Sequence, residues 1–201
     1  VGELLAEGFS LWSLGASVGL ELLVGVVIGY AASLPLIGMQ VGGQVIDQQV
    51  GMGLAGVFNP ELGDTSGPVG ELFFLTAMAV FALLGGHRIL LATLIGSFQQ
   101  IPLGQLTQFG SIVDLTLGLL SAAFELALRV AAPLLALVFL ETVAMGFIAR
   151  TVPQINILSV GFAARIIVGM MLLVASASIA IGVYADHLHW ALRRLMNFMA
   201  M

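Results

Sequence analysis

Long runs of residues without any charge are the feature that most limits how this chain can fold. Residues 22–46 and 89–113 each run for 25 positions without a charged side chain, and residues 166–185 do so for 20. A helix that crosses the ~30 Å hydrocarbon core of a bilayer needs about 20 mainly apolar residues. The spacing of the charges therefore predicts helices that cross a membrane.

The composition agrees with this prediction and excludes several classes of function. Charged residues make up 8% of the chain and hydrophobic residues 60%, whereas about 25% of residues are charged in a typical soluble domain. The net charge is −5 and the six basic residues are all arginine, so no basic surface is available for nucleic acid. The absence of cysteine excludes disulfides, thiolate catalysis and cysteine-ligated metals. At ~1.5 Å of rise per residue, the length sets an upper bound of about six membrane crossings.

Residues 40–70 differ from the rest of the chain because they are rich in glycine and glutamine. Irregular backbone of this kind is not tolerated against lipid, since each unpaired amide there costs several kcal/mol. The composition therefore predicts either a long loop outside the membrane or a re-entrant element beside a pore.

The rest of the sequence divides at charges and helix-breaking residues into apolar segments that are all expected to be helical. These segments are a first apolar helix over 11–39, a helical hairpin over 71–104, a long broken helical hairpin over 110–184 and an amphipathic C-terminal end over 185–201. Pro35 and Gly38 are expected to weaken the first helix, and Pro133 to break the long hairpin. Together the segments form a single membrane domain over 1–201, and the Arg193–Arg194 pair places its C-terminal end in the cytoplasm.

Several charged side chains lie within the apolar segments. Glu125 and Arg129 stand four positions apart, the spacing that places a carboxylate and a guanidinium on one face of a helix. Charges are costly in hydrocarbon, so these side chains should face protein or water. We interpret them as a structural ion pair that holds helices in register; an ion pathway that includes Glu141 is the alternative.

Histidines offer two further candidates for chemistry. Asp186, His187 and His189 are typical metal ligands, but side chains two positions apart on a helix diverge, and an interfacial segment is the simpler interpretation. His87 beside Arg88 is a candidate proton relay, although a histidine at a helix boundary is more often a structural hydrogen-bonding residue. No catalytic residue, metal ligand or cofactor site is predicted.

Four motifs in order then resemble a known family. The first runs from Gly43 through Gln49 to Gly51 and on to Phe58, Asn59 and Pro60, and is similar to G-x-x-I-x-x-Q-x-G…P. The others are Gly86–His87 followed by Pro102 and Gly104, an apolar step at Ala132–Pro133, and Arg150, Pro153, Gln154 and Asn156 followed by Gly161 and Phe162. Their order and spacing resemble the FliR family of flagellar biosynthetic proteins.

The chain departs from the family pattern at two places. The family usually has Pro-Leu and then Lys after its Gly-Phe pair, where this sequence has Ala163, Ala164 and Arg165. The family also has a longer N-terminal region with further apolar segments, which these 201 residues do not include.

The resemblance implies an all-α, nonenzymatic core subunit of the flagellar type III export gate in the bacterial inner membrane, at the flagellar basal body. Its membrane-embedded hairpins and broken helices would pack into a multi-subunit helical assembly with FliP-like and FliQ-like subunits and an FlhB-like protein, and would pass unfolded flagellar proteins. The loop over 51–70 is implied to plug the channel, with Gly51, Met52, Gly53, Phe58, Asn59 and Pro60 as plug residues. The alternatives are an injectisome export-gate subunit, a small-molecule or ion secondary transporter, and a structural scaffold without a pore.

Overall fold

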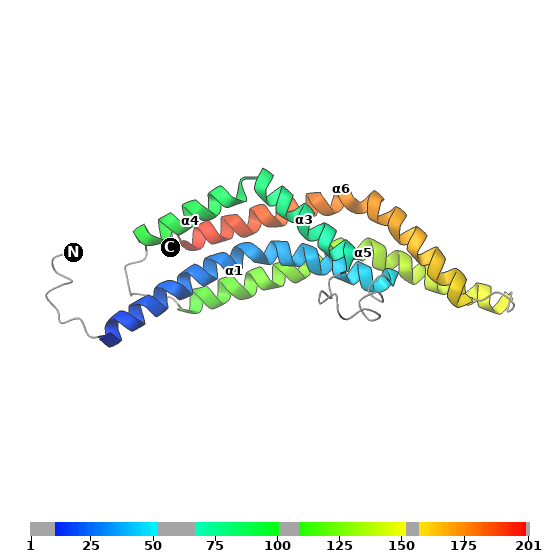
Figure 1. The fold of residues 1–201 in the computed structure, drawn as a ribbon, viewed down its shortest axis with the longest axis horizontal. Helices are drawn as coiled ribbons and strands as arrows, with labels where there is room; N and C mark the ends of the chain where they lie inside the picture. The colour runs from blue at the N-terminus through cyan, green and yellow to red at the C-terminus, as the bar shows by residue number, and fades with distance from the viewer. Residues whose placement is uncertain (1–10, 52–66, 101–108, 152–156, 200–201) are drawn as a thin grey trace.

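The structure, a computed structural model, describes residues 11–51, 67–100, 109–151 and 157–199 (Figure 1). These residues form helices throughout, apart from short turns, and contain no strand. The helices are α1 (Leu11–Val50), α3 (Pro68–Leu83), α4 (Gly86–Gln100), α5 (Phe109–Thr151) and α6 (Ile157–Met199). The all-α prediction is confirmed.

The three long helices form an elongated bundle. α1 and α5 run side by side in the same direction, and α6 returns along them in the opposite direction (Figure 1). α3 and α4 form a bent arch over this bundle, with α3 against α1 and α4 against α6. The hairpin of α5 and α6 extends beyond the C-terminal end of α1.

Each long helix is longer than a single membrane crossing requires. α1 has 40 residues and α5 and α6 have 43 each, which corresponds to roughly 60 Å of helix against a ~30 Å hydrocarbon core. Within the described residues, Gly15–Val50, Ile112–Thr151 and Val160–Phe198 are long and apolar enough to span a membrane, and the bent α3–α4 pair adds a fourth candidate. The described residues therefore contain three or four candidate crossings, fewer than the upper bound of about six.

The predicted boundary between a helix over 11–39 and a loop from residue 40 is wrong. α1 continues without a break through Pro35 to Val50. The glycines after residue 37 allow neighbouring helices to approach closely: a Cβ on Gly38 would lie 2.7 Å from the carbonyl oxygen of Ala123, and a Cβ on Gly43 would lie 2.6 Å from Cα of Gly70. The helix ends where Gly51 adopts a left-handed φ of 88°.

The predicted hairpin over 71–104 is instead a bent pair of helices. The chain bends by 66° between α3 and α4, which is too little for α4 to fold back along α3. Gly85 makes the turn with φ 72°, a conformation that favours glycine, and a Cβ on Gly86 would lie 2.4 Å from the ring of Phe81. α4 then packs on α1 and α6 and does not lie antiparallel to α3.

The long hairpin forms as predicted, but neither of its helices is broken. α5 passes through Pro133, which lies on the exposed side of the helix. α6 continues through the segment predicted as a separate amphipathic end, because Leu188, Leu192 and Leu195 are buried there and continue the helix's packed face. The charge-free run 89–113 does belong to two helices, since α4 ends at Gln100 and α5 begins at Phe109.

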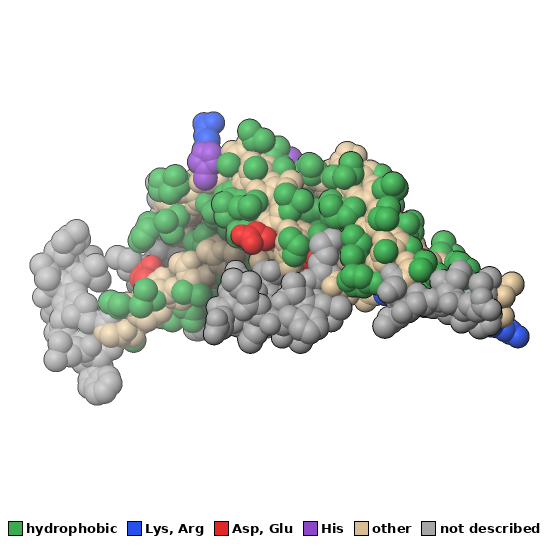
Figure 2. Space-filling model, turned by 45° about the vertical axis from the view of Figure 1, so that its right-hand side comes forward, with side chains coloured by type: hydrophobic (Ala, Val, Ile, Leu, Met, Phe, Trp, Pro, Cys, Tyr) green, Lys and Arg blue, Asp and Glu red, His purple; other side chains and the backbone are tan. Residues whose placement is uncertain are grey.

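The buried core lies in two clusters along the bundle. The larger joins α1, α3, α5 and α6 around Met39, Phe73, Leu126 and Tyr184. The smaller joins α1, α5 and α6 around Leu34, Leu119 and Leu195. Outside these clusters the helices expose many large apolar side chains, and hydrophobic side chains cover most of the described surface in Figure 2. Lipid or neighbouring proteins must cover that surface.

Candidate functional site

A single aspartate connects the end of α1 to the start of α3. The Asp47 carboxylate is buried and accepts hydrogen bonds from the backbone N–H of Val69 at 3.1 Å and of Gly70 at 2.8 Å. The residue before α3, Gly67, has no side chain to cap the helix, so Asp47 caps it from 22 positions away. A Cβ on Gly67 would lie 2.2 Å from Cγ of Asp47, so a side chain there would displace the carboxylate.

The last backbone hydrogen bond at the end of α1 is accepted by the same residue. The backbone N–H of Gly51 donates to the Asp47 carbonyl oxygen at 3.0 Å. Asp47 therefore contacts both Gly51 and the first turn of α3, the two points between which residues 52–66 lie. We call this arrangement of Asp47, Gly51, Gly67, Val69 and Gly70 the Asp47 junction.

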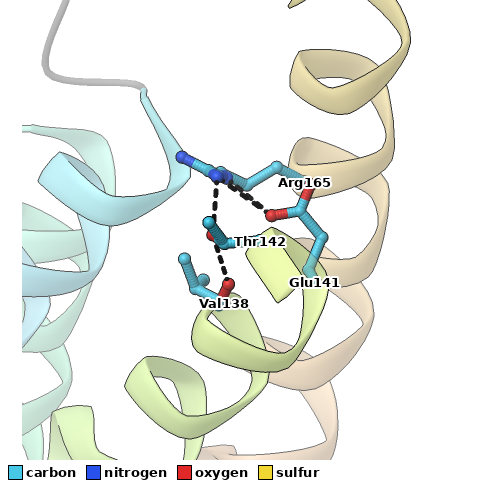
Figure 3. Close-up of polar contacts among 4 residues, drawn as sticks. All are labelled: Val138, Glu141, Thr142 and Arg165. Atoms are coloured by element: carbon cyan, nitrogen blue, oxygen red, sulfur yellow. Dashed lines mark hydrogen bonds and ion pairs between the residues drawn. The ribbon is translucent and has the colours of Figure 1, made fainter. Parts of the chain in front are cut away.

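An ion pair joins α5 to α6 near the tip of their hairpin (Figure 3). Arg165 donates from Nε and Nη2 to Oε2 of Glu141, at 3.1 and 2.9 Å. Nη2 also donates to the Thr142 hydroxyl at 3.2 Å, and that hydroxyl donates to the Val138 carbonyl oxygen at 2.8 Å. The Glu141 side chain is 12% exposed and that of Arg165 33%. This pair, and not the predicted one, connects two helices.

The second carboxylate oxygen of Glu141 is in an unusual position. Oε1 is buried and has no hydrogen-bond partner among the described residues. It lies near Gly161 of α6, where a Cβ would be 3.8 Å away. A buried acceptor without a donor is costly, so the pair with Arg165 must carry most of the compensation for burying this carboxylate.

Glu125 and Arg129 also form an ion pair, but both residues belong to α5. Arg129 Nη2 lies 2.6 Å from Glu125 Oε1, and Nε donates to the same oxygen at 2.8 Å. Their side chains are 60% and 54% exposed, and the pair does not connect α5 to any other described helix. The four-residue spacing predicted this ion pair correctly. The pair that connects two helices is that of Glu141 and Arg165.

Some of the motif glycines lie at close contacts between helices. Gly43 faces Gly70 of α3, and a Cβ on Gly51 would lie 2.8 Å from the ring of Phe162 on α6. Gly161, one residue earlier, faces Met145 of α5. These contacts bring the first and the last of the four motifs together, at the end of α1.

The other predicted residues are exposed, partly buried or outside the described ranges. His87 and Arg150 are exposed, and Gln49 is partly buried. The predicted residues that lie outside the described ranges are Met52, Gly53, Phe58, Asn59, Pro60, Pro102, Gly104, Pro153, Gln154 and Asn156. Among the candidate metal ligands, Nδ1 of His187 lies 2.9 Å from the carbonyl oxygen of Val183, one turn earlier in α6. Within the part of the chain that the structure describes, no three His, Asp or Glu side chains converge on a possible metal site.

Comparisons with known proteins identify the family of this chain. Residues 3–190 match the family described as bacterial export proteins, family 1. The chain is 30% identical to the flagellar biosynthetic protein FliR of Bacillus subtilis (strain 168), over 90% of this chain and 71% of that protein. It is 25% identical to FliR of Escherichia coli (strain K12), over 90% and 68%, and 28% identical to the Yop proteins translocation protein T of Yersinia pestis, over 78% and 61%. The chain therefore belongs to bacterial export protein family 1, the family that includes the FliR proteins.

Proposed function

We propose that this chain is a core subunit of the flagellar type III protein export gate and has no enzymatic activity of its own. The observation that carries the proposal is the family match over residues 3–190, together with relatives that are named flagellar biosynthetic protein FliR. Three apolar helices of about 60 Å support an integral membrane protein. Its place would be the bacterial inner membrane at the flagellar basal body.

The partners proposed for this chain are FliP-like and FliQ-like gate subunits and an FlhB-like protein. The surface supports an obligate assembly, because the hairpin tip exposes Phe139, Phe147, Phe162, Ile167 and Met171. Roughly 60 Å of apolar helix cannot be covered by a ~30 Å hydrocarbon layer unless the helix tilts strongly. Neighbouring subunits would cover the remainder, and unfolded flagellar proteins would pass through the channel between them.

We also propose that the segment between Gly51 and Gly67 occupies this channel in its closed state. The Asp47 junction supports the idea because it holds both ends of the segment at one place on the bundle. α1 and α3 therefore fix where the two residues that flank the segment, Gly51 and Gly67, lie on the bundle.

Co-purification and complementation together test the proposed function. The tagged chain, extracted in mild detergent from its native cells, should bring FliP-like and FliQ-like proteins with it in fixed proportion. Deleting its gene should abolish flagellin export and motility, and the intact gene should restore both. A stable protein without these partners, or normal flagellin export after the deletion, would refute the proposal.

An injectisome subunit is the second candidate, because a Yersinia translocation protein is among the relatives. The same deletion strain distinguishes the two systems. Loss of flagellin from the medium with effector secretion unchanged supports the flagellar assignment, and the reverse pattern supports the injectisome.

A further inference from the structure

The two core clusters of the bundle meet at a proline in α1. The α1 side chains of the smaller cluster end at Leu34, and those that pack in the larger cluster begin at Leu36. Pro35 lies between them and is buried, so it faces the core. The bundle therefore has two halves, each with its own core. We call them the Leu34 half, around the smaller cluster, and the Met39 half, around the larger one.

The proline deprives α1 of one backbone hydrogen bond at this boundary. Pro35 has no N–H group, so the carbonyl oxygen of Ala31, four positions earlier, receives no bond from it, and the proline ring crowds that carbonyl. α1 is continuous here, but it lacks one of the bonds that resist bending, and helices bend most sharply at such positions. Pro133 of α5 differs, because it is exposed and lies among residues of the larger cluster, away from the boundary.

A small cavity lies beside this proline. Its volume is about 10 Å³, room for one water molecule. Three helices line it, with side chains from both clusters, and the lining residues are Pro35, Leu119, Ala122, Ala123, Leu126, His187 and Ala191. Side chains in a protein core normally leave little empty space. Here they do not completely close the boundary between the two halves.

α1 and α5 touch through backbone atoms next to the cavity. A Cβ on Gly38 would lie 2.7 Å from the carbonyl oxygen of Ala123 and 3.1 Å from its Cα. Helices usually interlock by placing side chains of one in the grooves of the other. Gly38 has no side chain to place in a groove of α5, so α1 can tilt at this contact without repacking one.

The arch of α3 and α4 bends at the same boundary. α3 packs against the larger cluster through Phe73 and Ala77. At the start of α4, Ile89 packs against the larger cluster and Leu90 against the smaller one. The 66° bend, with Gly85 at φ 72°, therefore lies where the arch passes from one half to the other. α5 and α6 cross the boundary as unbroken helices, which restricts any motion of the halves to bending.

We infer that Pro35 is a hinge about which the Met39 half bends relative to the Leu34 half. The Asp47 junction and the Glu141–Arg165 pair both belong to the Met39 half, and each joins two helices, so this half moves as a unit. Bending at the hinge moves the Asp47 junction, with the ends of α1 and α3 that it joins, relative to the Leu34 half. The hinge is a property of the bundle and does not depend on the proposed export function.

Cysteine labelling tests the hinge, because the chain has no cysteine of its own. Ala191→Cys places a thiol at the cavity, and Ala180→Cys places one in the larger cluster on the same helix; the two alanines are 5% and 4% exposed. The complex purified with its partners is treated with a small methanethiosulfonate reagent, and mass spectrometry follows each labelled peptide. When opening is fast relative to labelling, the rate follows the population of the open form. Pro35→Ala restores the missing hydrogen bond, so labelling of Ala191→Cys should slow about fivefold, the factor that one net hydrogen bond supplies.

Further comparisons separate a hinge from a general change in stability. Pro35→Ala should leave the labelling rate of Ala180→Cys unchanged, and Pro133→Ala, at the exposed proline, should leave both rates unchanged. Pro35→Gly also restores the N–H group, but glycine weakens a helix by about the same factor, so labelling of Ala191→Cys should stay near the rate measured with Pro35. Equal slowing of both cysteines by Pro35→Ala, or no slowing of Ala191→Cys, would each overturn the hinge.

Discussion

Arg165 on α6 donates two hydrogen bonds to one carboxylate oxygen of Glu141 on α5, from Nε at 3.1 Å and from Nη2 at 2.9 Å. The two residues are 24 positions apart and lie on opposite arms of the hairpin. Because the Glu141 side chain is nearly buried, sliding one helix past the other by a turn would leave its charge unpaired. The pair therefore fixes the register of α5 against α6.

Glu141→Gln should destabilise the purified complex, because it leaves the Arg165 guanidinium without its counter-charge. We expect a loss of roughly 1–3 kcal/mol, less than for a fully buried pair because Arg165 is partly exposed. The measurement is the midpoint of thermal unfolding in detergent. The double variant Glu141→Gln/Arg165→Gln should lose less free energy of unfolding than the sum of the losses of the two single variants, because both single substitutions remove the same interaction.

The Glu125–Arg129 pair supplies the matched control for this experiment. It has similar geometry but is exposed and lies within one helix, so Glu125→Gln should change stability by no more than about 0.5 kcal/mol. Equal losses from Glu125→Gln and Glu141→Gln would contradict the assignment of register control to Arg165 and Glu141.

Asp47→Ala should loosen the start of α3. The variant leaves the N–H groups of Val69 and Gly70 without acceptors, which should cost about 1–2 kcal/mol. Hydrogen exchange followed by mass spectrometry should show faster exchange in the peptide that begins at Gly67 than in a peptide from the middle of α5. Gly67→Ala should have the same effect, because its Cβ would displace the Asp47 carboxylate, whereas Glu71→Gln, an exposed change in the same turn, should not. Normal exchange in both Asp47→Ala and Gly67→Ala would exclude the capping role.

Local patterns allowed prediction wherever the responsible residues are near one another in the sequence. The charge-free runs indicated the helices, and the four-residue spacing of Glu125 and Arg129 produced their contact. Each of these depends on backbone geometry within one or two helical turns.

Prediction failed where distant residues decide the outcome. Glycine in a loop and glycine between packed helices look the same in composition, so residues 40–50 were assigned to a loop although Ala123 and Gly70 require small residues there. The link from Asp47 to Val69 and that from Glu141 to Arg165 span 22 and 24 positions. A search for opposite charges on neighbouring apolar helices would have found the second link.

Alanine substitutions should separate glycines that permit close packing from glycines that do not. Gly43→Ala places a Cβ 2.6 Å from Cα of Gly70, so α1 and α3 must separate, and we expect a loss of about 1–3 kcal/mol. Gly25→Ala is the control, because nothing lies within 4 Å of a Cβ there and alanine is the better helix former by roughly 1 kcal/mol. The midpoint of thermal unfolding should be lower for Gly43→Ala than for the wild type, and for Gly25→Ala it should equal or exceed that of the wild type. The opposite order would contradict the packing role of Gly43.

Replacing residues 52–66 with a short Gly-Ser linker should leave the complex assembled but permeable to small solutes. Assembly should survive because the Asp47 carboxylate joins the end of α1 to the first turn of α3 through contacts outside the deleted residues, at Val69 and Gly70. Permeability should rise because the proposed plug is missing. The measurement is the conductance of purified complexes in planar bilayers, with the yield of FliP-like and FliQ-like partners as the control for assembly. A complex that retains its partners and shows wild-type conductance would remove the plug role from this segment, whereas loss of the partners would show that the segment is needed for assembly.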